Sequence, residues 1–186
     1  MSTKDHILDT AESLFNKNGY TAVGVDLIRD TAGVSKTSMY RHFGSKNKLI
    51  VAVLTRRHLR FEEKLGGVIT PNMNIEEKLE ALIDWHFKWF GTTDFHGCMF
   101  MHAMSEFKES DDSIANSALM HKKWLKGLIK EIISSNPELN EKQIESKSEA
   151  IMTFVEGMIM RAESSDITEF RLIYRIAIQT LSKTNF

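Results

Sequence analysis

The chain has 186 residues, of which 42% are hydrophobic and only two are proline. This length and composition fit one domain of ordinary size or two small ones, mostly helical, and no low-complexity segment or strand-like alternation is present. The net charge of −1 conceals an asymmetry. Residues 1–60 hold 10 Lys and Arg against 5 Asp and Glu, net +5, whereas the remainder holds 14 against 20, net −6. Basic charge is therefore concentrated at the N-terminal end, where it favours contact with phosphates.

A single cysteine, Cys98, excludes an intramolecular disulfide and a multi-cysteine zinc site, and it is consistent with a reducing cytoplasm. The N-terminus MSTKDHILDT is too polar for a signal peptide. No apolar run approaches the roughly 18 residues of a membrane span. We therefore expect a cytoplasmic protein without a membrane segment.

Three short helices are predicted in the first quarter of the chain. The first has its apolar face at Ile7, Leu8, Ala11, Leu14 and Phe15. In the second, apolar residues recur at intervals of three and four and therefore lie along one side of the helix: Val25, Leu27, Ile28 and Ala32. Gly33 ends the second helix, because glycine accepts the left-handed conformation that follows a helix C-terminus.

The third predicted helix spans Lys36–Phe43. The hydroxyl of Ser35 can bond a free backbone N–H at its start, and Met39 and Phe43, four residues apart, can face inward. The opposite face carries Lys36, Thr37, Ser38, Tyr40, Arg41 and His42. Short hydroxyls, a lysine and an arginine at the exposed start of a second helix suit base edges and phosphates, as in the reader of a helix-turn-helix.

A longer helix is predicted to follow at once. Gly44 ends the third helix, and Ser45 can cap the next one, which begins at Lys46. The ammonium of Lys46 then lies beside the positive N-terminus of this helix, and the two together form a phosphate-binding site. This helix can continue to Gly66-Gly67, over about 20 residues or roughly 30 Å. It is long enough to join two domains.

The segment GVSKTSMYRHFGSKNKL closely resembles the pattern G-V-S-x-x-x-h-Y-x-H-F-x-S-K-x-x-L, with h apolar, of TetR-type (TetR/AcrR) transcriptional regulators. The matching residues are Gly33, Ser35, Tyr40, His42, Phe43, Ser45, Lys46 and Leu49. Asn18-Gly19-Tyr20 also looks like the helix-ending turn of that family. Two residues depart from the pattern: Gly24 stands where a hydroxyl cap is usual, and Arg29 where a small residue is common. The resemblance covers roughly the first quarter of the chain.

The resemblance implies an all-α fold in three parts: a helix-turn-helix DNA-binding domain at 1–45, a connecting helix at 46–66, and a helical ligand-binding and dimerisation domain at 67–186. It implies a homodimeric regulator, expected to be a repressor, that binds a near-palindromic DNA operator and is released by a small apolar or aromatic effector. The residues expected to contact DNA are Ser35, Lys36, Thr37, Ser38, Tyr40, Arg41, His42 and Lys46. Of these, Lys36, Thr37 and Ser38 are expected at base edges. No cofactor or metal is expected.

Five further helices are predicted, at about 75–90, 98–107, 112–134, 141–163 and 167–182. Three of them follow cap patterns, namely Asn74 with Glu77, Asn140 with Gln143, and Asp166 with Glu169. The last two have more apolar width than a lone surface helix needs. By the resemblance they are expected to form a dimer bundle, with interface residues Ile151, Phe154, Val155, Met158, Phe170, Ile173, Tyr174 and Ala177. The alternative is that these helices close the core of their own subunit.

Large, soft or aromatic side chains are more numerous in the acidic part than a tight small core demands. On this ground and by the resemblance, a ligand pocket is expected to be lined by Trp85, Trp89, Phe90, Phe100, Met101, Met104, Trp124 and Met158. For any one of them alone, an ordinary core position is the favoured alternative.

His96, Cys98 and His102 fall within seven positions, and His86 precedes them. A zinc site needs three or four converging ligands, and only Cys98 and His102 share helical spacing, so a structural role is favoured. No recognisable cysteine-enzyme segment, phosphate loop, carboxylate pair or serine elbow occurs, and we expect no enzyme. Two alternatives stay open: the same regulator with Cys98 as a redox or electrophile sensor, and a helical interaction protein that does not bind DNA.

Overall fold

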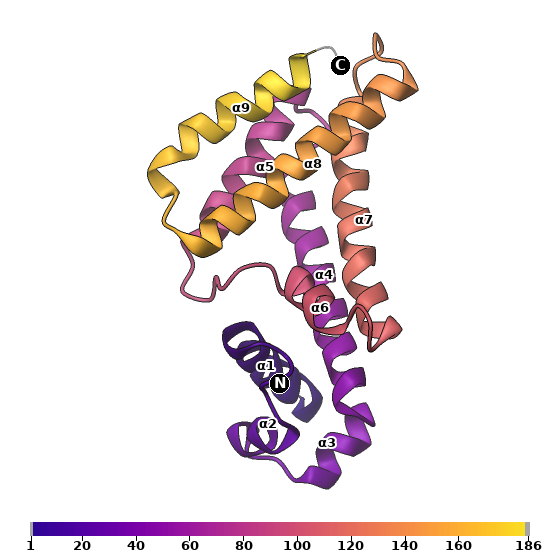
Figure 1. The fold of residues 1–186 in the computed structure, drawn as a ribbon, viewed down its shortest axis with the longest axis vertical. Coiled ribbons are helices and arrows are strands. Elements are labelled where there is room, and N and C mark those ends of the chain that lie inside the picture. Colours follow the sequence, from indigo (N-terminus) through magenta and orange to yellow (C-terminus); the bar gives the residue numbers. More distant parts are fainter. Residues whose placement is uncertain (1, 185–186) are drawn as a thin grey trace. The chain divides into compact units, whose positions relative to one another are not determined.

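The computed structural model describes residues 2–184, and within this range every regular element is a helix (Figure 1). The helices are α1 Thr3–Asn18, α2 Val25–Ala32, α3 Lys36–Phe43, α4 Lys46–Val68, α5 Ile75–Phe90, α6 Met99–Phe107, α7 Asp112–Ser134, α8 Glu141–Ser164, the 3-10 helix η1 Thr168–Phe170, and α9 Arg171–Lys183. The all-α fold class predicted from the sequence is confirmed. None of the helices described is long and apolar enough to cross a lipid bilayer.

The chain divides into two compact units. Unit 1 comprises the described residues up to Arg60 together with Cys98–His121, and unit 2 comprises Phe61–Gly97 and the described residues from Lys122 onward. Two of the three boundaries lie inside continuous helices, α4 and α7, and the third lies between Gly97 and Cys98, just before α6. These units differ from the domain limits expected at residues 45 and 66, because α6 and the first part of α7 pack with the N-terminal helices.

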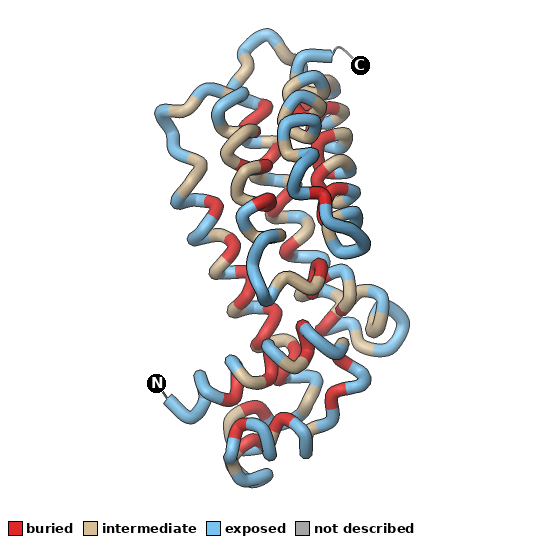
Figure 2. The backbone as a smooth tube through the Cα atoms, turned by 90° about the vertical axis from the view of Figure 1, so that its left-hand side faces the viewer, coloured by how far each residue is buried: buried red, intermediate tan, exposed pale blue. Residues whose placement is uncertain are grey.

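In unit 1, α1 packs on α2, α2 packs on α3, and α6 packs against the turn that follows α1. Figure 2 shows buried positions recurring along the helices with exposed ones between them. The largest side chains of this core include Ile7, Phe15, Tyr20, Ile28, Leu49 and Ile50. Their burial supplies most of the stability that holds three short helices together, since helices of eight residues are not stable alone.

In unit 2, α9 packs against both α5 and α8 (Figure 1). The core of this unit includes Leu79, Leu82, Ile129, Ile151, Val155, Met158 and Ile178. Ion pairs join the antiparallel helices α7 and α8, between Lys122 and Glu156 at 3.1 Å and between Lys130 and Glu141 at 2.6 Å. The second pair is exposed and contributes little to stability, whereas the Lys122 side chain is largely buried.

Two of the three predicted caps have the geometry that the sequence indicates. Asn74 and Asn140 each form reciprocal hydrogen bonds with the residue three positions later, Glu77 and Gln143. The cap predicted at Asp166 with Glu169 is wrong. Asp166 accepts hydrogen bonds from the main-chain N and the Oγ1 of Thr168, which starts a 3-10 turn, and α9 begins only at Arg171.

Candidate nucleic-acid interface

The turn between α2 and α3 is built by one glycine and one serine. Gly33 has φ 62° and ψ 32°, the left-handed conformation, and its N–H bonds the carbonyl oxygen of Asp30 at 3.2 Å. A methyl group at Gly33 would meet no atom within 4 Å, so only the backbone angle demands glycine. The Oγ of Ser35 accepts a hydrogen bond from the nitrogen of Ser38 at 3.1 Å and so begins α3. The predicted helix-turn-helix geometry is therefore confirmed.

The two faces of α3 differ as the sequence indicates. Met39 and Phe43 are buried and attach the helix to its unit. The opposite face is exposed at Ser35, Lys36, Thr37, Tyr40 and Arg41, and partly exposed at Ser38 and His42. The Nε2 of His42 is buried, with no hydrogen-bond partner among the residues that the structure describes. The eight predicted contact residues thus include a row of accessible hydroxyl and cationic groups.

Acidic side chains on α2 lie close to this face, and an arginine pairs with both of them. Arg29, one of the two departures from the TetR pattern, pairs with Asp26 at 2.9 Å and with Asp30 at 2.6 Å. Lys36 is only 3.9 Å from the same Asp26 carboxylate and remains mostly exposed. Because Arg29 already satisfies this carboxylate, the ammonium of Lys36 stays available to an outside anion.

Lys46 begins α4, which follows α3 after Gly44 and Ser45. Its Nζ lies 3.4 Å from the carbonyl oxygen of Thr21, to which it donates. Partial burial lowers the pKa of Lys46 from its ordinary value, while the nearby Glu106 carboxylate acts in the opposite direction. Lys46 thus lies at a helix N-terminus with its ammonium in contact with the backbone of Thr21.

The residues expected to line a ligand pocket fall in both units. Phe100 in unit 1 is buried with its ring stacked on His121, at 3.7 Å between centroids, and Met101 beside it is exposed. In unit 2 the rings of Trp85 and Trp89 both contact Phe61, at 4.9 and 5.2 Å. Met104 and Trp124 are half-buried, and Met158 is fully buried. The aromatic side chains of unit 2 thus pack largely on one another.

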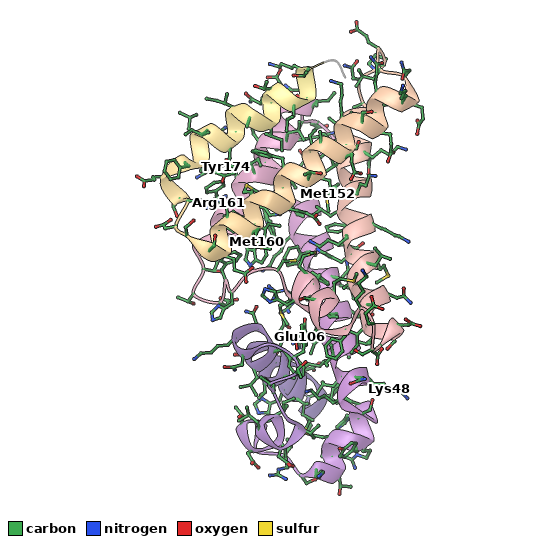
Figure 3. All side chains as sticks on the ribbon, viewed as in Figure 1. Lys48, Glu106, Met152, Met160, Arg161 and Tyr174 are labelled. Atoms are coloured by element: carbon green, nitrogen blue, oxygen red, sulfur yellow. The ribbon has the colours of Figure 1, made fainter. Side chains whose placement is uncertain are left out.

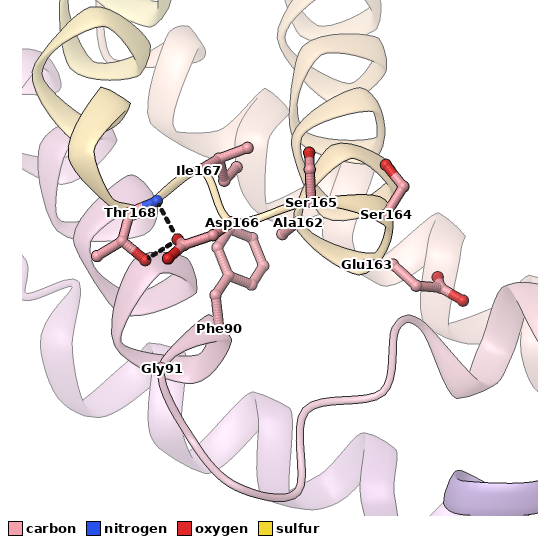
Figure 4. A pocket seen from close by; sticks show the side chains of 9 residues that line it. All are labelled: Phe90, Gly91, Ala162, Glu163, Ser164, Ser165, Asp166, Ile167 and Thr168. Atoms are coloured by element: carbon pink, nitrogen blue, oxygen red, sulfur yellow. Dashed lines mark hydrogen bonds between the residues drawn. The ribbon is translucent and has the colours of Figure 1, made fainter.

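Unit 2 has a pocket of about 490 Å³ at the C-terminal ends of α5 and α8 (Figure 4). Of the residues expected around a ligand, it includes only Phe90. The remaining lining is mainly polar and comes from the last turn of α8 and the segment before α9; it includes Glu163, Ser164, Ser165, Asp166 and Thr168. This pocket therefore lacks the apolar and aromatic wall that the sequence indicates.

The cysteine and histidines do not converge on a metal. Among the residues described, no group of three or more His, Cys, Asp or Glu side chains is placed to hold one. His86 is buried in α5, where burial lowers its pKa to about 4 and its Nδ1 lies 2.7 Å from the oxygen of Leu82. Cys98 is buried at the start of α6.

Three of the residues predicted at a dimer interface are not on the surface. Ile151, Val155 and Met158 of α8 are buried inside unit 2, so the prediction is wrong for them. They form the face of α8 that closes its own subunit, and helical spacing alone does not tell that face from an outer one. Phe154, Tyr174 and Ala177 are half-buried, and Phe170 and Ile173 are exposed.

Comparison with known proteins supports the assignment of the N-terminal helices. Residues 7–53 match the family model for bacterial regulatory proteins of the tetR family. The helix-turn-helix is of the TetR family. The fold of the whole chain is also of TetR type: SCO4454, a TetR-family transcriptional regulator from Streptomyces coelicolor, superposes with a TM-score of 0.88 at 18% identity, covering 97% of this chain and 94% of that one. The reduced form of Escherichia coli NemR gives a TM-score of 0.82 at 19% identity, over 97% of each chain.

Curated relatives match less than half of this chain. The transcriptional activator FasR of Mycolicibacterium smegmatis is 33% identical over 84 residues, which are 45% of this chain and 38% of FasR. The repressor NemR of Escherichia coli K12 is 36% identical over 67 residues, 36% of this chain and 34% of NemR. The matched region thus spans only about a third of each relative. Both relatives are named as transcriptional regulators rather than as enzymes.

Two groups of residues in unit 1 escaped the sequence analysis. Glu12 is buried against three arginines of α4, and Glu106 on α6 contacts the turn after α1. The partners are more than 40 residues apart in both cases, and neither carboxylate stands in a motif. For the Glu12 group, the only signal in the sequence is an acidic residue on the apolar side of α1, near Ala11 and Phe15.

Proposed function

We propose that this protein is a homodimeric transcriptional regulator, expected to be a repressor, that binds a near-palindromic DNA operator and releases it on binding a small effector. The observation that carries the proposal is the exposed polar face of α3, with its cap at Ser35 and its inner face buried at Met39 and Phe43. A helix presented in this way fits the major groove.

The side chains of this face divide by reach and chemistry. We assign Lys36, Thr37 and Ser38, at the start of the helix, to base edges, because the N-terminal residues of a recognition helix read bases. Tyr40, His42 and Lys46 are assigned to phosphates, and Arg41 to either.

The dimer is proposed to form through α9 and the outer face of α8. The apolar side chains exposed there are Met160, Phe170, Leu172, Ile173 and Ile176. Gathered at the end of α8, in η1 and on α9, this is more exposed apolar surface than a monomer ordinarily carries. A second copy related by a two-fold axis would cover it and would place two recognition helices on paired half-sites about 34 Å apart.

The effector is proposed to act through α4, which begins with Lys46 in unit 1 and ends in unit 2. A ligand changes operator affinity only if it binds one spacing of the recognition helices better than another. Compounds that bind, by thermal shift, should therefore include some that weaken operator binding. Equal operator affinity with every binding compound would refute this part.

Selection of bound fragments from random duplex DNA tests the central proposal. The full chain should enrich a near-palindromic sequence, and Lys36→Ala should lose most of that enrichment. Lys123→Ala is a matched control, because Lys123 is an exposed lysine of α7 in unit 2. If the unchanged protein enriches no sequence, although it is folded and dimeric, the protein is a helical interaction protein instead.

A further inference from the structure

One carboxylate of α6 binds the turn between α1 and α2. The Oε1 of Glu106 accepts a hydrogen bond from the nitrogen of Tyr20 at 3.0 Å, and its Oε2 accepts one from the nitrogen of Thr21 at 2.6 Å. Figure 3 labels Glu106 on α6, on the side of that helix that faces the N-terminal helices. Although partial burial raises the pKa of this carboxyl, the hydrogen bonds from Thr21 and Tyr20 lower it overall, so the group is ionised.

Tyr20, a residue of the same turn, also contacts the N-terminal end of α6. The hydroxyl of Tyr20, fully buried, donates to the carbonyl oxygen of Met99 at 2.9 Å. Its ring contacts Phe107 edge to face, with centroids 6.0 Å apart. Gly19 has φ 79°, and a methyl group there would lie 3.2 Å from the Oε1 of Glu106, so glycine permits both the turn and the close approach. Tyr20 thereby meets the first and the last residue of α6.

Thr21 connects Glu106 to Lys46. Its N–H points to the carboxylate of Glu106, and its carbonyl oxygen accepts from the Nζ of Lys46 at 3.4 Å. The carboxylate also attracts the ammonium directly. All these residues belong to unit 1. A cation expected to hold a DNA phosphate and a carboxylate from outside the helix-turn-helix thus contact the same backbone residue, Thr21.

We propose that Glu106 is a positioning residue for operator recognition. It acts on the Lys46 ammonium through the backbone of Thr21 and through its own negative charge. Only a correctly placed DNA phosphate can then take the place of the contact between Lys46 and Thr21. The inference rests on the proposed DNA-binding function. A free lysine would bind any phosphate within reach, whereas a lysine held by a carboxylate gives up part of its attraction to DNA in general. Glu106 therefore improves discrimination between operator and other duplexes at some cost in overall affinity.

Neutralising the carboxylate separates this role from a purely structural one. In Glu106→Gln, Lys46 loses its counter-charge, so affinity for a scrambled duplex should rise and its salt slope should steepen by up to about 0.9. Operator affinity should rise less or fall, and the operator-to-scrambled ratio should drop about threefold or more. A residue that only stabilised the fold would lower both affinities together and leave the ratio unchanged.

Glu106→Asp is the second variant, in case the Glu106→Gln protein does not fold. It keeps the charge but is too short to accept both N–H groups, so scrambled-duplex affinity should stay at the wild-type value while operator affinity falls. Glu109→Gln is the matched control, because Glu109 is 89% exposed and only 3.9 Å from Lys108, its ion-pair partner. It makes the same charge change on the segment after α6 and should leave the ratio unchanged.

The measurements are salt titrations of affinity for the selected duplex and for a scrambled duplex of equal length and composition, each with the folded fraction checked by thermal unfolding. If Glu106→Gln and Glu106→Asp keep the wild-type ratio, or if Glu109→Gln lowers it equally, the inference is wrong. If the wild-type chain itself prefers neither duplex, the proposed function fails instead, and the two failures are distinct.

Discussion

The carboxylate of Glu12 accepts a hydrogen bond from the Nη1 of Arg57 at 3.0 Å, and both side chains are buried between α1 and α4. Arg56 donates to the other oxygen at 2.9 Å, and Arg60 also pairs with this carboxylate. α1 supports the helix-turn-helix, and α4 carries Lys46, so this cluster connects two elements that place the DNA-reading face.

Replacing Glu12 by glutamine should destabilise the protein by about 3 kcal/mol at neutral pH, because it leaves arginine charges that Glu12 now compensates inside the protein. The value lies at the low end for a buried pair, since Arg60 is 42% exposed and water can solvate it. Chemical denaturation measures it. Asp9→Asn is the control: Asp9 pairs with Arg56 at 2.8 Å but is half exposed, so its loss should cost less than about 1 kcal/mol.

The same carboxylate predicts acid sensitivity. Burial raises the pKa of Glu12, but hydrogen bonds and charges from Arg60, Arg57 and Arg56 outweigh it and lower the pKa below the usual value. A group with a depressed folded pKa contributes its full stability above the unfolded pKa of about 4.3 and loses it as the pH falls through the folded pKa. Unfolding free energy should therefore fall more steeply below about pH 4 in wild type than in Glu12→Gln. Parallel curves for the two proteins would show that Glu12 is not stabilised in the fold.

Replacing glycine by alanine should change the free energy of unfolding in opposite directions at two positions. Gly33→Ala should destabilise by about 1–2 kcal/mol, because φ 62° is unfavourable for a side chain although the space around it is open. Gly127→Ala, inside α7, should stabilise by about 0.5–1 kcal/mol, because alanine favours a helix and again nothing lies within 4 Å. Thermal unfolding of both variants decides this. A Gly33→Ala protein as stable as wild type would mean that the turn adopts another conformation.

The helix-turn-helix could be predicted from the sequence because its signals are local. Gly33 and Ser35 act on groups within five positions, and the spacing of Met39 and Phe43 fixes the inner face of α3. The same holds for the reciprocal caps at Asn74 and Asn140. A residue type at a given offset determines these features without knowledge of the rest of the fold.

Other features depend on partners that the spacing does not name. The apolar face of α8 was expected to meet a second copy, yet Ile151 and Val155 pack inside the same chain, because periodicity identifies an apolar face and not what covers it. The contact of Glu106 with Thr21 spans 85 positions. Such pairings follow from the tertiary packing of α6, which no local pattern encodes.

Two lysines should differ in how they affect DNA binding. Lys46→Ala should weaken binding to the operator and to other duplexes and reduce the salt slope by about 0.9, because it removes one phosphate contact. Lys36→Ala should also reduce the preference among operator variants, because this residue is assigned to a base edge. Salt titrations with the selected duplex and its single-base variants measure both effects, with Lys123→Ala as control. Unchanged affinity in both variants would contradict the assignment of α3 as the reader.

The α9 surface should carry the dimer. Ile173 is 61% exposed, beside Leu172 at 65% and Ile176 at 54%. A glutamate there would have to lose its hydration in an apolar interface, so Ile173→Glu should shift the protein to monomer in sedimentation velocity at micromolar concentration. Binding to a palindromic duplex should weaken much more than binding to a single half-site, because only the former needs two readers on one particle.

Leu59→Glu is the matched control, because Leu59 is 56% exposed on α4 in unit 1. The substitution places the same charge at an exposed apolar position as Ile173→Glu does. It should leave the association constant at the wild-type value. If Ile173→Glu stays dimeric while Leu59→Glu dissociates, the two-fold contact lies on unit 1. In that case the apolar side chains of α9 serve another partner, and the spacing of the two recognition helices is set within the DNA-reading unit itself.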